Sequence, residues 1–131
     1  MVCRIRLGTT IISARGTVVN CAMVVVPMVM NQSCYGIRGV LNDSDNYSYY
    51  LLRSNIADLQ SRGHGSVFNT ITRETFSTIQ VVEPTLNILT HYEDRVSAFF
   101  EKILINVIQN NTLTLIRDTL LPRVMSGEIE I

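Results

Sequence analysis

The sequence predicts an α+β protein in which short strands and one or two helices are followed by a long C-terminal helix. In the first two-thirds of the chain, β-branched segments alternate with turn residues, which is typical of short strands. From residue 85 to residue 121, apolar residues instead recur at helical spacing, which predicts an amphipathic helix. We therefore divide the chain into a mixed domain over residues 1–84 and a helical region over residues 85–131.

Several segments of the mixed domain are predicted to be extended. Residues 9–14 and 17–26 are rich in β-branched residues and end at Arg15-Gly16 and at Pro27. Glycine and proline interrupt regular structure, so these residues mark turns. The further extended segments that we predict are residues 28–37, 66–72 and 79–82.

One helix is predicted inside the mixed domain, over residues 47–62. Its apolar side chains fall on one helical face. Ser44 or Asp45 can cap its first turn, and Gly63-His64-Gly65 stops it. Residues 73–78 are expected to form a turn that leads into the last extended segment.

Two structures are open for the helical region. A single helix over residues 85–121 would contain about 35 residues and extend roughly 50 Å. Alternatively, the weak helix formers Gln109-Asn110-Asn111 break the region into two shorter helices. In both cases we expect Pro122 and Gly127 to end the helical pattern.

A single helix of this length needs a partner helix, because so small a domain cannot cover its whole apolar stripe. The stripe is close to a seven-residue repeat that polar residues interrupt. A polar residue in such a seam can fix register and oligomeric state. The predicted helix-pairing residues are Leu89, Tyr92, Val96, Phe99, Ile103, Asn110, Leu113 and Leu120.

The charge of the chain is balanced overall but not locally. Eleven basic residues match eleven acidic ones, so the strongly basic signature of a stand-alone nucleic-acid binder is absent. Seven arginines nevertheless lie between Arg4 and Arg73, where only three acids occur. Arginine presents a planar fork of donors that suits phosphate and guanine. The N-terminal part is therefore either a nucleic-acid surface or simply a solvated arginine-rich face.

Composition favours a folded protein of the cytoplasm. Hydrophobic residues make up 47% of the chain and charged residues 17%, which is enough apolar material for a core. Three widely separated cysteines without CxxC spacing argue against a disulfide framework and against a zinc site. No signal peptide is recognisable, and the apolar run over residues 21–30 is too short to span a membrane. We expect no metal and no cofactor.

Four blocks of sequence carry a family resemblance. Residues 11–18 (IISARGTV), 27–35 (PMVMNQSCY) and 65–72 (GSVFNTIT) resemble successive parts of a target recognition domain in the DNA specificity subunits of type I restriction-modification systems. Residues 115–129 (LIRDTLLPRVMSGEI) are similar to the close of the helical region in the same family. The blocks follow the family's order over nearly the whole chain.

The resemblance implies a DNA-recognition and assembly module that is not itself an enzyme. In that family, a recognition domain of mixed α/β type reads one half of a split DNA site. A long helix follows it and packs as an antiparallel coiled coil against another such helix. The subunit bridges methyltransferase subunits and, indirectly, motor-nuclease subunits. The implied partners are therefore double-stranded DNA, these subunits, and a second copy or another specificity fragment.

The chain also departs from the family pattern. From the resemblance, we expect one recognition domain without its first part, because the Arg15-Gly16-Thr17 block normally lies well inside that domain in the family. Val19-Asn20 stands where the family commonly has Gly-Lys, which removes a cation. The alternative function is therefore that of a truncated or split fragment that dimerises through its helix without binding DNA.

The candidate DNA contacts are arginines and loop residues near glycine. Arg15 lies at a glycine turn, and residues 62–66 form a glycine-containing loop after a helix, where backbone can approach phosphate closely. A capping or salt-bridging role is an alternative for each. The candidate set is Arg15, Arg38, Arg62, His64, Ser66 and Arg73.

Catalytic chemistry is not expected. Residues 31–35 (NQSCY) superficially resemble the Asn-Pro-Pro-Tyr motif of adenine methyltransferases, but both prolines are absent. We expect Asn31 and Gln32 to bond loop backbone instead. Cys34 and His64 are not predicted to lie together, so Cys34 is expected to be a small packed residue and not a nucleophile.

Overall fold

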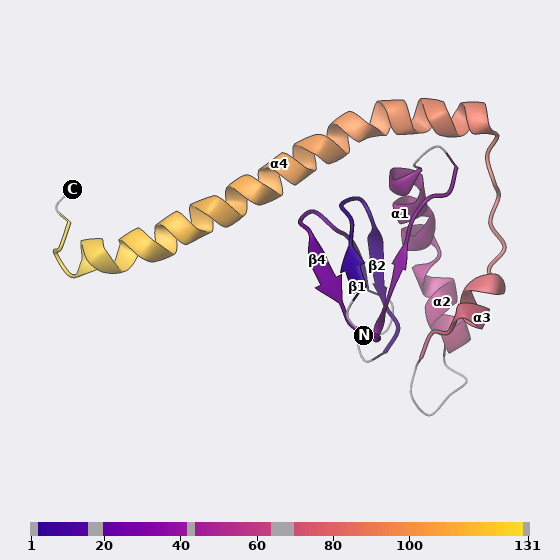
Figure 1. Ribbon diagram of the computed structural model, residues 1–131, viewed down its shortest axis with the longest axis horizontal. Coiled ribbons are helices and arrows are strands. Elements are labelled where there is room, and N and C mark those ends of the chain that lie inside the picture. The colour runs from indigo at the N-terminus through magenta and orange to yellow at the C-terminus, as the bar shows by residue number, and fades with distance from the viewer. Residues whose placement is uncertain (1–2, 16–19, 42–43, 64–69, 130–131) are drawn as a thin grey trace. The chain divides into compact units, whose positions relative to one another are not determined.

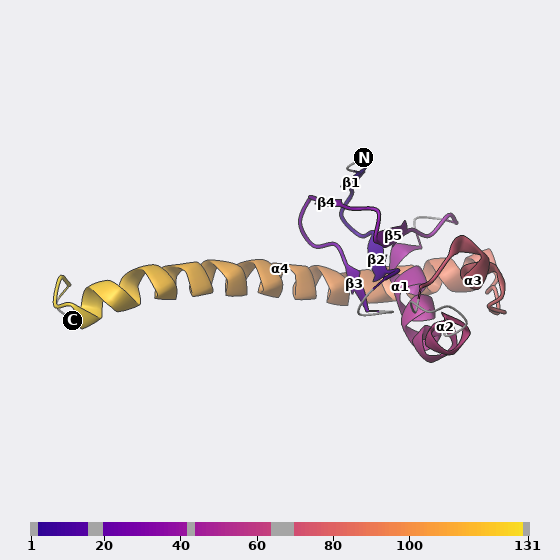
Figure 2. The ribbon, with the colours of Figure 1, turned by 90° about the horizontal axis from the view of Figure 1, so that it is seen from below.

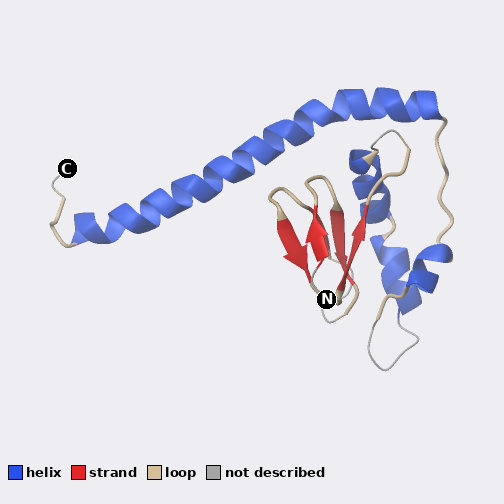
Figure 3. Cartoon of the chain, viewed as in Figure 1, coloured by secondary structure: helices blue, strands red, loops and turns tan. Residues whose placement is uncertain are grey.

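The computed structural model describes residues 3–15, 20–41, 44–63 and 70–129. Figure 1 shows these residues as a mixed strand and helix region followed by one long helix, and Figure 3 colours the two kinds of element. The predicted α+β class is therefore confirmed. The elements are β1 (Cys3–Ile5), β2 (Thr10–Ser13), β3 (Cys21–Met23), β4 (Met28–Met30), β5 (Cys34–Ile37), α1 (Asp45–Ser54), α2 (Ile56–Gly63), α3 (Arg73–Ser77) and α4 (Leu86–Met125).

The chain forms two compact units, Met1–Ser97 and Ala98–Ile131. All the strands, the three short helices and roughly the first three turns of α4 belong to the first unit. The rest of α4 belongs to the second. The first unit therefore extends past Pro84, where the sequence predicted a boundary, and includes the base of the long helix.

The strands form two small antiparallel sheets. In the first, β2 lies between β3 and β5, and Ile12 stands opposite both Cys21 and Tyr35. In the second, β1 pairs with β4. Figure 2 shows the β1–β4 pair on the side of the three-stranded sheet away from α1 and α2. The Met30 side chain of β4 packs against Gly36 of β5, so the two sheets are in contact there. A Cβ atom added to Gly36 would lie 3.4 Å from that side chain.

The core lies between the three-stranded sheet and the helices. Ile12, Leu59 and Ile71 are the most deeply buried apolar side chains, at 0%, 0% and 1% exposure. Burying each contributes about 1.5–3 kcal/mol. Tyr35 and Phe76 meet edge to face beside them, with ring centroids 5.5 Å apart. The core thus joins β2, α2 and the residues that precede α3.

The single helix predicted over residues 47–62 is wrong, because the chain forms two helices that meet at Asn55. The backbone of Asn55 has φ −100° and ψ 9°, and its side-chain amide donates to the carbonyl of Leu51 at 2.7 Å. Asparagine side chains compete with the backbone for such carbonyls, which ends helices. The break changes the direction of the chain and lets Leu59 of α2 reach the core.

The final predicted strand, over residues 79–82, is also wrong. These residues have no regular structure, and the carbonyl of Val82 accepts a hydrogen bond from the Tyr47 hydroxyl at 3.0 Å. Residues 70–72 of the predicted strand 66–72 are not a strand either, and residues 66–69 lie outside the described residues.

The predicted turn over residues 73–78 is the short helix α3. It begins with a capping box, in which Thr72 accepts from the N–H of Thr75 while the Thr75 hydroxyl accepts from the N–H of Thr72. The Thr-x-x-Thr spacing supplies the two oxygens that this cap needs.

The helical region is one continuous helix of 40 residues, roughly 60 Å long. It passes through residues 109–111 without a break. The predicted end at Pro122 is wrong by one turn. Proline removes one hydrogen bond to the carbonyl four residues earlier and its ring crowds that carbonyl, yet the helix continues through Pro122 to Met125. Gly127, with φ 73°, follows the helix, and the N–H of Glu128 donates to the carbonyl of Arg123 at 2.9 Å.

The base of α4 is attached to α1 through Glu93. Ser44, the residue that precedes α1, makes no side-chain capping bond. The Glu93 carboxylate accepts instead from the backbone N–H of Tyr47 and from the side-chain amide of Asn46, both at 2.8 Å. Tyr47 and Tyr92 meet edge to face, and Leu89 is 2% exposed. A carboxylate at a helix N-terminus satisfies free donors and the helix dipole.

Candidate nucleic-acid interface

The part of the chain that supplies the strands is basic in composition. The first 42 residues supply all five strands and contain Arg4, Arg6, Arg15 and Arg38, but neither aspartate nor glutamate. By composition, this segment is therefore the most basic part of the chain, although the Asp45 carboxylate of α1 lies beside Gly8 and Arg38.

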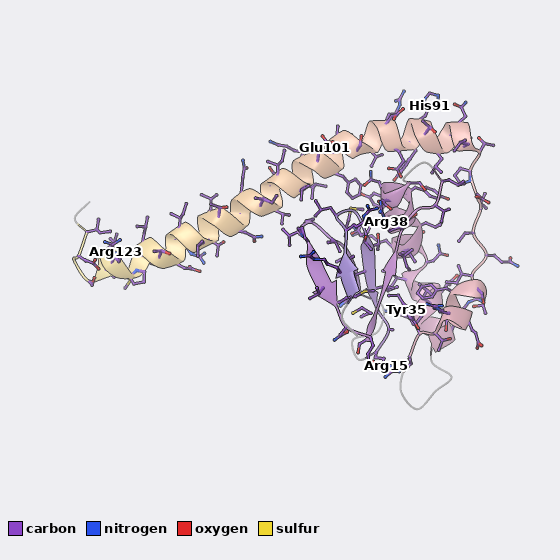
Figure 4. All side chains as sticks on the ribbon, viewed as in Figure 1. Arg15, Tyr35, Arg38, His91, Glu101 and Arg123 are labelled. Carbon is purple, nitrogen blue, oxygen red and sulfur yellow. The ribbon has the colours of Figure 1, made fainter. Side chains whose placement is uncertain are left out.

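The antiparallel register separates Arg15 from Arg38. Ser13 of β2 pairs with Cys34 at the start of β5, whereas Thr10 pairs with Ile37 at its end. Arg15 follows β2 and Arg38 follows β5, so the two arginines lie at opposite ends of the three-stranded sheet. Figure 4 shows them in these positions. The predicted contact set is therefore not gathered on one surface.

Arg73 lies at the same end of the sheet as Arg15. The N–H of Ile71 donates to the carbonyl of Ala14 at 3.0 Å, and Arg73 begins α3 two residues later. Both arginines are exposed. This end of the sheet therefore presents two guanidinium groups to solvent.

Arg62, although exposed, donates a hydrogen bond to another part of the chain. The Nη1 of Arg62 donates to the carbonyl of Thr78 at 2.9 Å, which joins the last turn of α2 to the residue after α3. His64 and Ser66 lie outside the described residues.

Arg38 forms the best-defined ion pair of the described residues. Its Nη2 lies 2.6 Å from Oδ2 of Asp45, and its Nε lies 3.2 Å from both carboxylate oxygens. The N–H of Gly39 donates to the same carboxylate at 3.0 Å. The side chains of Arg38 and Asp45 are 33% and 14% exposed. This pair ties the end of β5 to the first residue of α1, which is the salt-bridging role that the sequence left open.

A wide-open surface depression of ≈ 690 Å³ is lined by Arg38 and by two arginines outside the predicted set. Arg4 and Arg6 line it with Ile5, Leu7 and Pro27. The signal that could have identified them is the alternation Arg-Ile-Arg-Leu over residues 4–7. In a strand, residues two apart share a face.

The predicted helix-pairing residues fall into two groups. Leu89 and Tyr92 pack within the first unit, and Val96 is half-buried. Phe99, Ile103, Leu113 and Leu120 are 70%, 51%, 61% and 42% exposed, and Asn110 is exposed as well. The exposed part of the predicted seam therefore begins at Phe99.

The apolar surface of α4 is wider than the predicted seam. Leu115 is 69% exposed and Met125 79% exposed, although neither was expected in the seam. A helix that is apolar on several sides is normally buried on several sides. The other large exposed apolar residues of α4 outside the seam are Leu86, Ile88, Ile105, Ile108, Ile116 and Leu121.

Asn31, Cys21 and Cys34 have structural and not catalytic surroundings. The side-chain oxygen of Asn31 accepts from the N–H of Ser33 at 2.9 Å, which confirms the role expected for Asn31. Cys21 and Cys34 are free and half-buried. Burial raises the pKa of the Cys21 thiol, while the positive charge of Arg53 lowers it by less. Such a shift disfavours the thiolate that a nucleophile requires.

Two kinds of site are not found in the described parts of the chain. The residues that the structure describes contain no group of three or more potential metal ligands. No helix within the described ranges has both the length and the apolar character needed to cross a membrane.

Comparison with known proteins identifies the family. The chain is 40% identical over 74 residues to the Type I restriction enzyme HindI specificity subunit of Haemophilus influenzae. This match takes in 56% of the chain but 16% of that relative, so the chain corresponds to a small part of the relative's length. Residues 3–115 match the family described as the type I restriction modification DNA specificity domain. That match includes all five strands, α1, α2, α3 and most of α4, and the chain therefore belongs to the type I restriction modification DNA specificity domain family.

Proposed function

We propose that this chain recognises a DNA sequence within a type I restriction-modification complex and performs no chemistry of its own. The family match over residues 3–115 is the observation that carries the proposal. The arginines of residues 1–42, a segment without aspartate or glutamate, support it, because phosphate contacts by arginine supply much of the affinity of DNA-binding proteins. Arg15 and Arg73 are the favoured contacts among the predicted residues, followed by Arg62, His64, Ser66 and Arg38.

The proposed partners of α4 are another specificity helix and a methyltransferase subunit. A second copy of this chain, or a separate specificity fragment, would pair along Phe99, Ile103 and Leu113. The additional exposed apolar residues, such as Leu115, supply a further contact for a methyltransferase subunit, which in turn would recruit the motor-nuclease subunits. Exposed apolar surface on this scale is typical of interaction sites. The whole assembly would act in the cytoplasm.

The alternative is a dimerising fragment that does not read DNA. Two observations favour it: the charge of the chain is balanced, and Arg38 and Arg62 are bonded within the fold. In that case α4 would still pair, but the strands would have no affinity for a duplex.

Binding to duplex DNA separates the two functions. Fluorescence anisotropy with a pool of labelled duplexes should show binding by the chain together with its methyltransferase subunit, with affinity that falls linearly on a log–log plot as salt rises. Selection and sequencing of the retained duplexes should return one common half-site. A chain that joins the methyltransferase but adds no affinity or preference for any duplex would establish the dimerising fragment.

A further inference from the structure

We propose that α4 pairs with α4 of a second copy of this chain in one specific register, in which Asn110 faces Asn106 of the second copy. The proposal rests on the proposed pairing of α4 and adds to it the identity of the partner and the residues that fix the register. Both asparagines are exposed, so their amide groups are open to a partner helix.

The two asparagines lie in the middle of the exposed seam. Phe99, Ile103, Asn106, Asn110 and Leu113 follow one another at alternating spacings of four and three residues along α4. Residues at this spacing lie on one face of a helix and form the seam of a helix pair. All five side chains are exposed, so this stretch of the seam is free to pack against another helix.

Arg117 favours the antiparallel orientation. It continues the seam four residues after Leu113, and in a parallel pair each seam residue meets its own copy. Two arginines would then meet in the interface. Asp118, whose Oδ1 lies 2.7 Å from Nη2 of Arg117, offsets the charge in part, but the burial of two such ion pairs carries a desolvation cost. In the proposed antiparallel pair Arg117 instead faces Phe99 of the second copy, whose ring face attracts a cation.

The asparagines distinguish between antiparallel registers that differ by seven residues. In two of these registers Asn110 faces either Phe99 or Leu113 of the second copy, and its amide would be buried against an apolar side chain without a hydrogen-bond partner. In the proposed register Asn110 faces Asn106, and each amide can donate to the oxygen of the other. Ile103 then faces Leu113, so apolar residues also meet apolar residues.

The buried base of α4 argues independently against one of the other registers. If Asn110 faced Phe99, the same spacing would bring Leu120 of the second copy to Leu89. Leu89 is 2% exposed, because it already packs inside the first unit, and it has no surface left for another helix. In the proposed register Leu120 faces Val96, which is only half-buried. Burial and the matching of polar groups therefore favour the same register.

The seam is complementary to itself, which favours a second copy as the partner. Outward from the point midway between Asn106 and Asn110, asparagine meets asparagine, Ile103 meets Leu113, and Phe99 meets Arg117. A twofold interface uses the same surface on both subunits and needs this kind of match. Pairing with a different helix would not require it.

Cysteine pairs test the register directly. Single-cysteine chains are made in a background in which the three native cysteines are replaced by serine. Oxidation of an equimolar mixture of Asn106→Cys and Asn110→Cys chains, one of them carrying an affinity tag, should give the mixed disulfide dimer as the main product. Facing seam positions bring the Cβ atoms close enough for a disulfide.

Matched mixtures report the other arrangements. Asn110→Cys mixed with Phe99→Cys, or with Leu113→Cys, should give several-fold less mixed dimer, because these pairs face each other only in the two disfavoured registers. Asn106→Cys alone should give little disulfide dimer, since that position meets its own copy only in a parallel pair. If any of these samples forms more disulfide dimer than the Asn106/Asn110 mixture does, the proposed register is overturned.

A charge exchange at the same two positions gives a second test. Asn106→Asp/Asn110→Lys should remain a dimer in light scattering, because each new carboxylate faces a new ammonium group in the proposed register. Asn106→Asp/Asn110→Asp should fall to the monomer mass, since like charges then face each other. Circular dichroism checks that both variants keep the helix. Equal masses for the two variants would overturn the inference.

The outcomes also separate this inference from the proposed function, because neither test uses DNA. A chain that dimerises in the proposed register but binds no duplex would leave the inference standing and remove the proposed function. A parent chain that is a monomer by itself, yet binds DNA together with another specificity fragment, would overturn the inference and leave DNA recognition intact.

Discussion

Glu93 of α4 caps α1: its Oε1 accepts a 2.8 Å hydrogen bond from the backbone N–H of Tyr47. The two residues are 46 positions apart. Glu93 nevertheless accepts a hydrogen bond from a first-turn N–H, which is usually accepted by the side chain of the residue that precedes the helix. The base of the long helix is therefore part of the folded domain.

Replacing Glu93 should destabilise the first unit. Glu93→Ala removes the acceptor for Tyr47 and Asn46, and loss of a cap costs about 1 kcal/mol. For a domain of this size, that corresponds to a fall of roughly 4–8 °C in melting temperature. Thermal unfolding followed by circular dichroism measures it. Glu101→Ala, at an exposed position of the same helix, is the matched control and should leave the melting temperature unchanged. Equal melting temperatures for the two variants would contradict the cap.

Replacing Thr10 with valine should leave stability unchanged or raise it. Thr10 is 0% exposed, and its hydroxyl has no hydrogen-bond partner among the described residues. Valine has nearly the same shape and removes the cost of burying an unpaired hydroxyl, about 1–3 kcal/mol. Thr10→Ser, which keeps the hydroxyl and loses a methyl group, should be less stable by about 1 kcal/mol. Urea unfolding of both variants gives the comparison. A Thr10→Val variant less stable than Thr10→Ser would show that the hydroxyl has a partner.

Arg38 and Arg15 should respond differently to replacement by alanine. Arg38→Ala leaves the Asp45 carboxylate without its main partner, so we expect a loss of roughly 1–3 kcal/mol in unfolding free energy. Arg15 is exposed, and Arg15→Ala should change stability by less than about 0.5 kcal/mol. Chemical denaturation measures both. Similar losses for the two variants would mean that the Arg38–Asp45 pair does not stabilise the fold.

Charges placed on the predicted seam of α4 should prevent pairing. Ile103 and Leu113 are about half exposed or more, at 51% and 61%, so Ile103→Asp/Leu113→Asp should fold as a single chain but lose its partner helix. Light scattering coupled to size-exclusion chromatography should report a fall to the monomer mass. Asn111→Asp/Thr112→Asp adds the same charge to another side of the helix and should retain the mass of the parent. Equal masses for the two variants would place the interface elsewhere on α4.

Cys21 should react with alkylating agents more slowly at neutral pH than free cysteine does. Burial raises the pKa of its thiol and so reduces the thiolate fraction, while Arg53 acts in the opposite direction. In a chain with Cys3 and Cys34 replaced by serine, the iodoacetamide rate of Cys21 should rise at a higher pH than that of free cysteine. Arg53→Ala should move the profile higher still, and Arg95→Ala should not. Movement to lower pH in Arg53→Ala would contradict the effect of the arginine charge.

Local sequence patterns predicted the fold class and much of the long helix. Residues 10–13, 21–23 and 34–37 fall inside predicted extended segments because alternation and turn residues act over a few positions. The helical repeat likewise extends along the whole of α4. A pattern of this kind could not decide whether residues 109–111 break the helix, since propensity differences there are small.

The contacts between distant segments could not be predicted in this way. Nothing in the sequence near Asn55 indicates that its side chain will end α1, and nothing near Tyr47 indicates a cap from Glu93. The same holds for the candidate site. The sequence does not indicate that Asp45 pairs with Arg38. It also does not indicate that Arg4 and Arg6 lie near Arg38. Tertiary contacts determine these outcomes.

The cap on α1 also determines when the domain can finish folding during its synthesis. Tyr47 leaves the ribosome 46 residues before Glu93, which at 5–20 residues per second is roughly 2–9 s. During that interval the backbone N–H of Tyr47 and the side-chain amide of Asn46 lack the Glu93 acceptor. The nascent domain therefore cannot reach its final stability until the beginning of the long helix has been made, so the first turns of α4 are the last part of the domain to be completed.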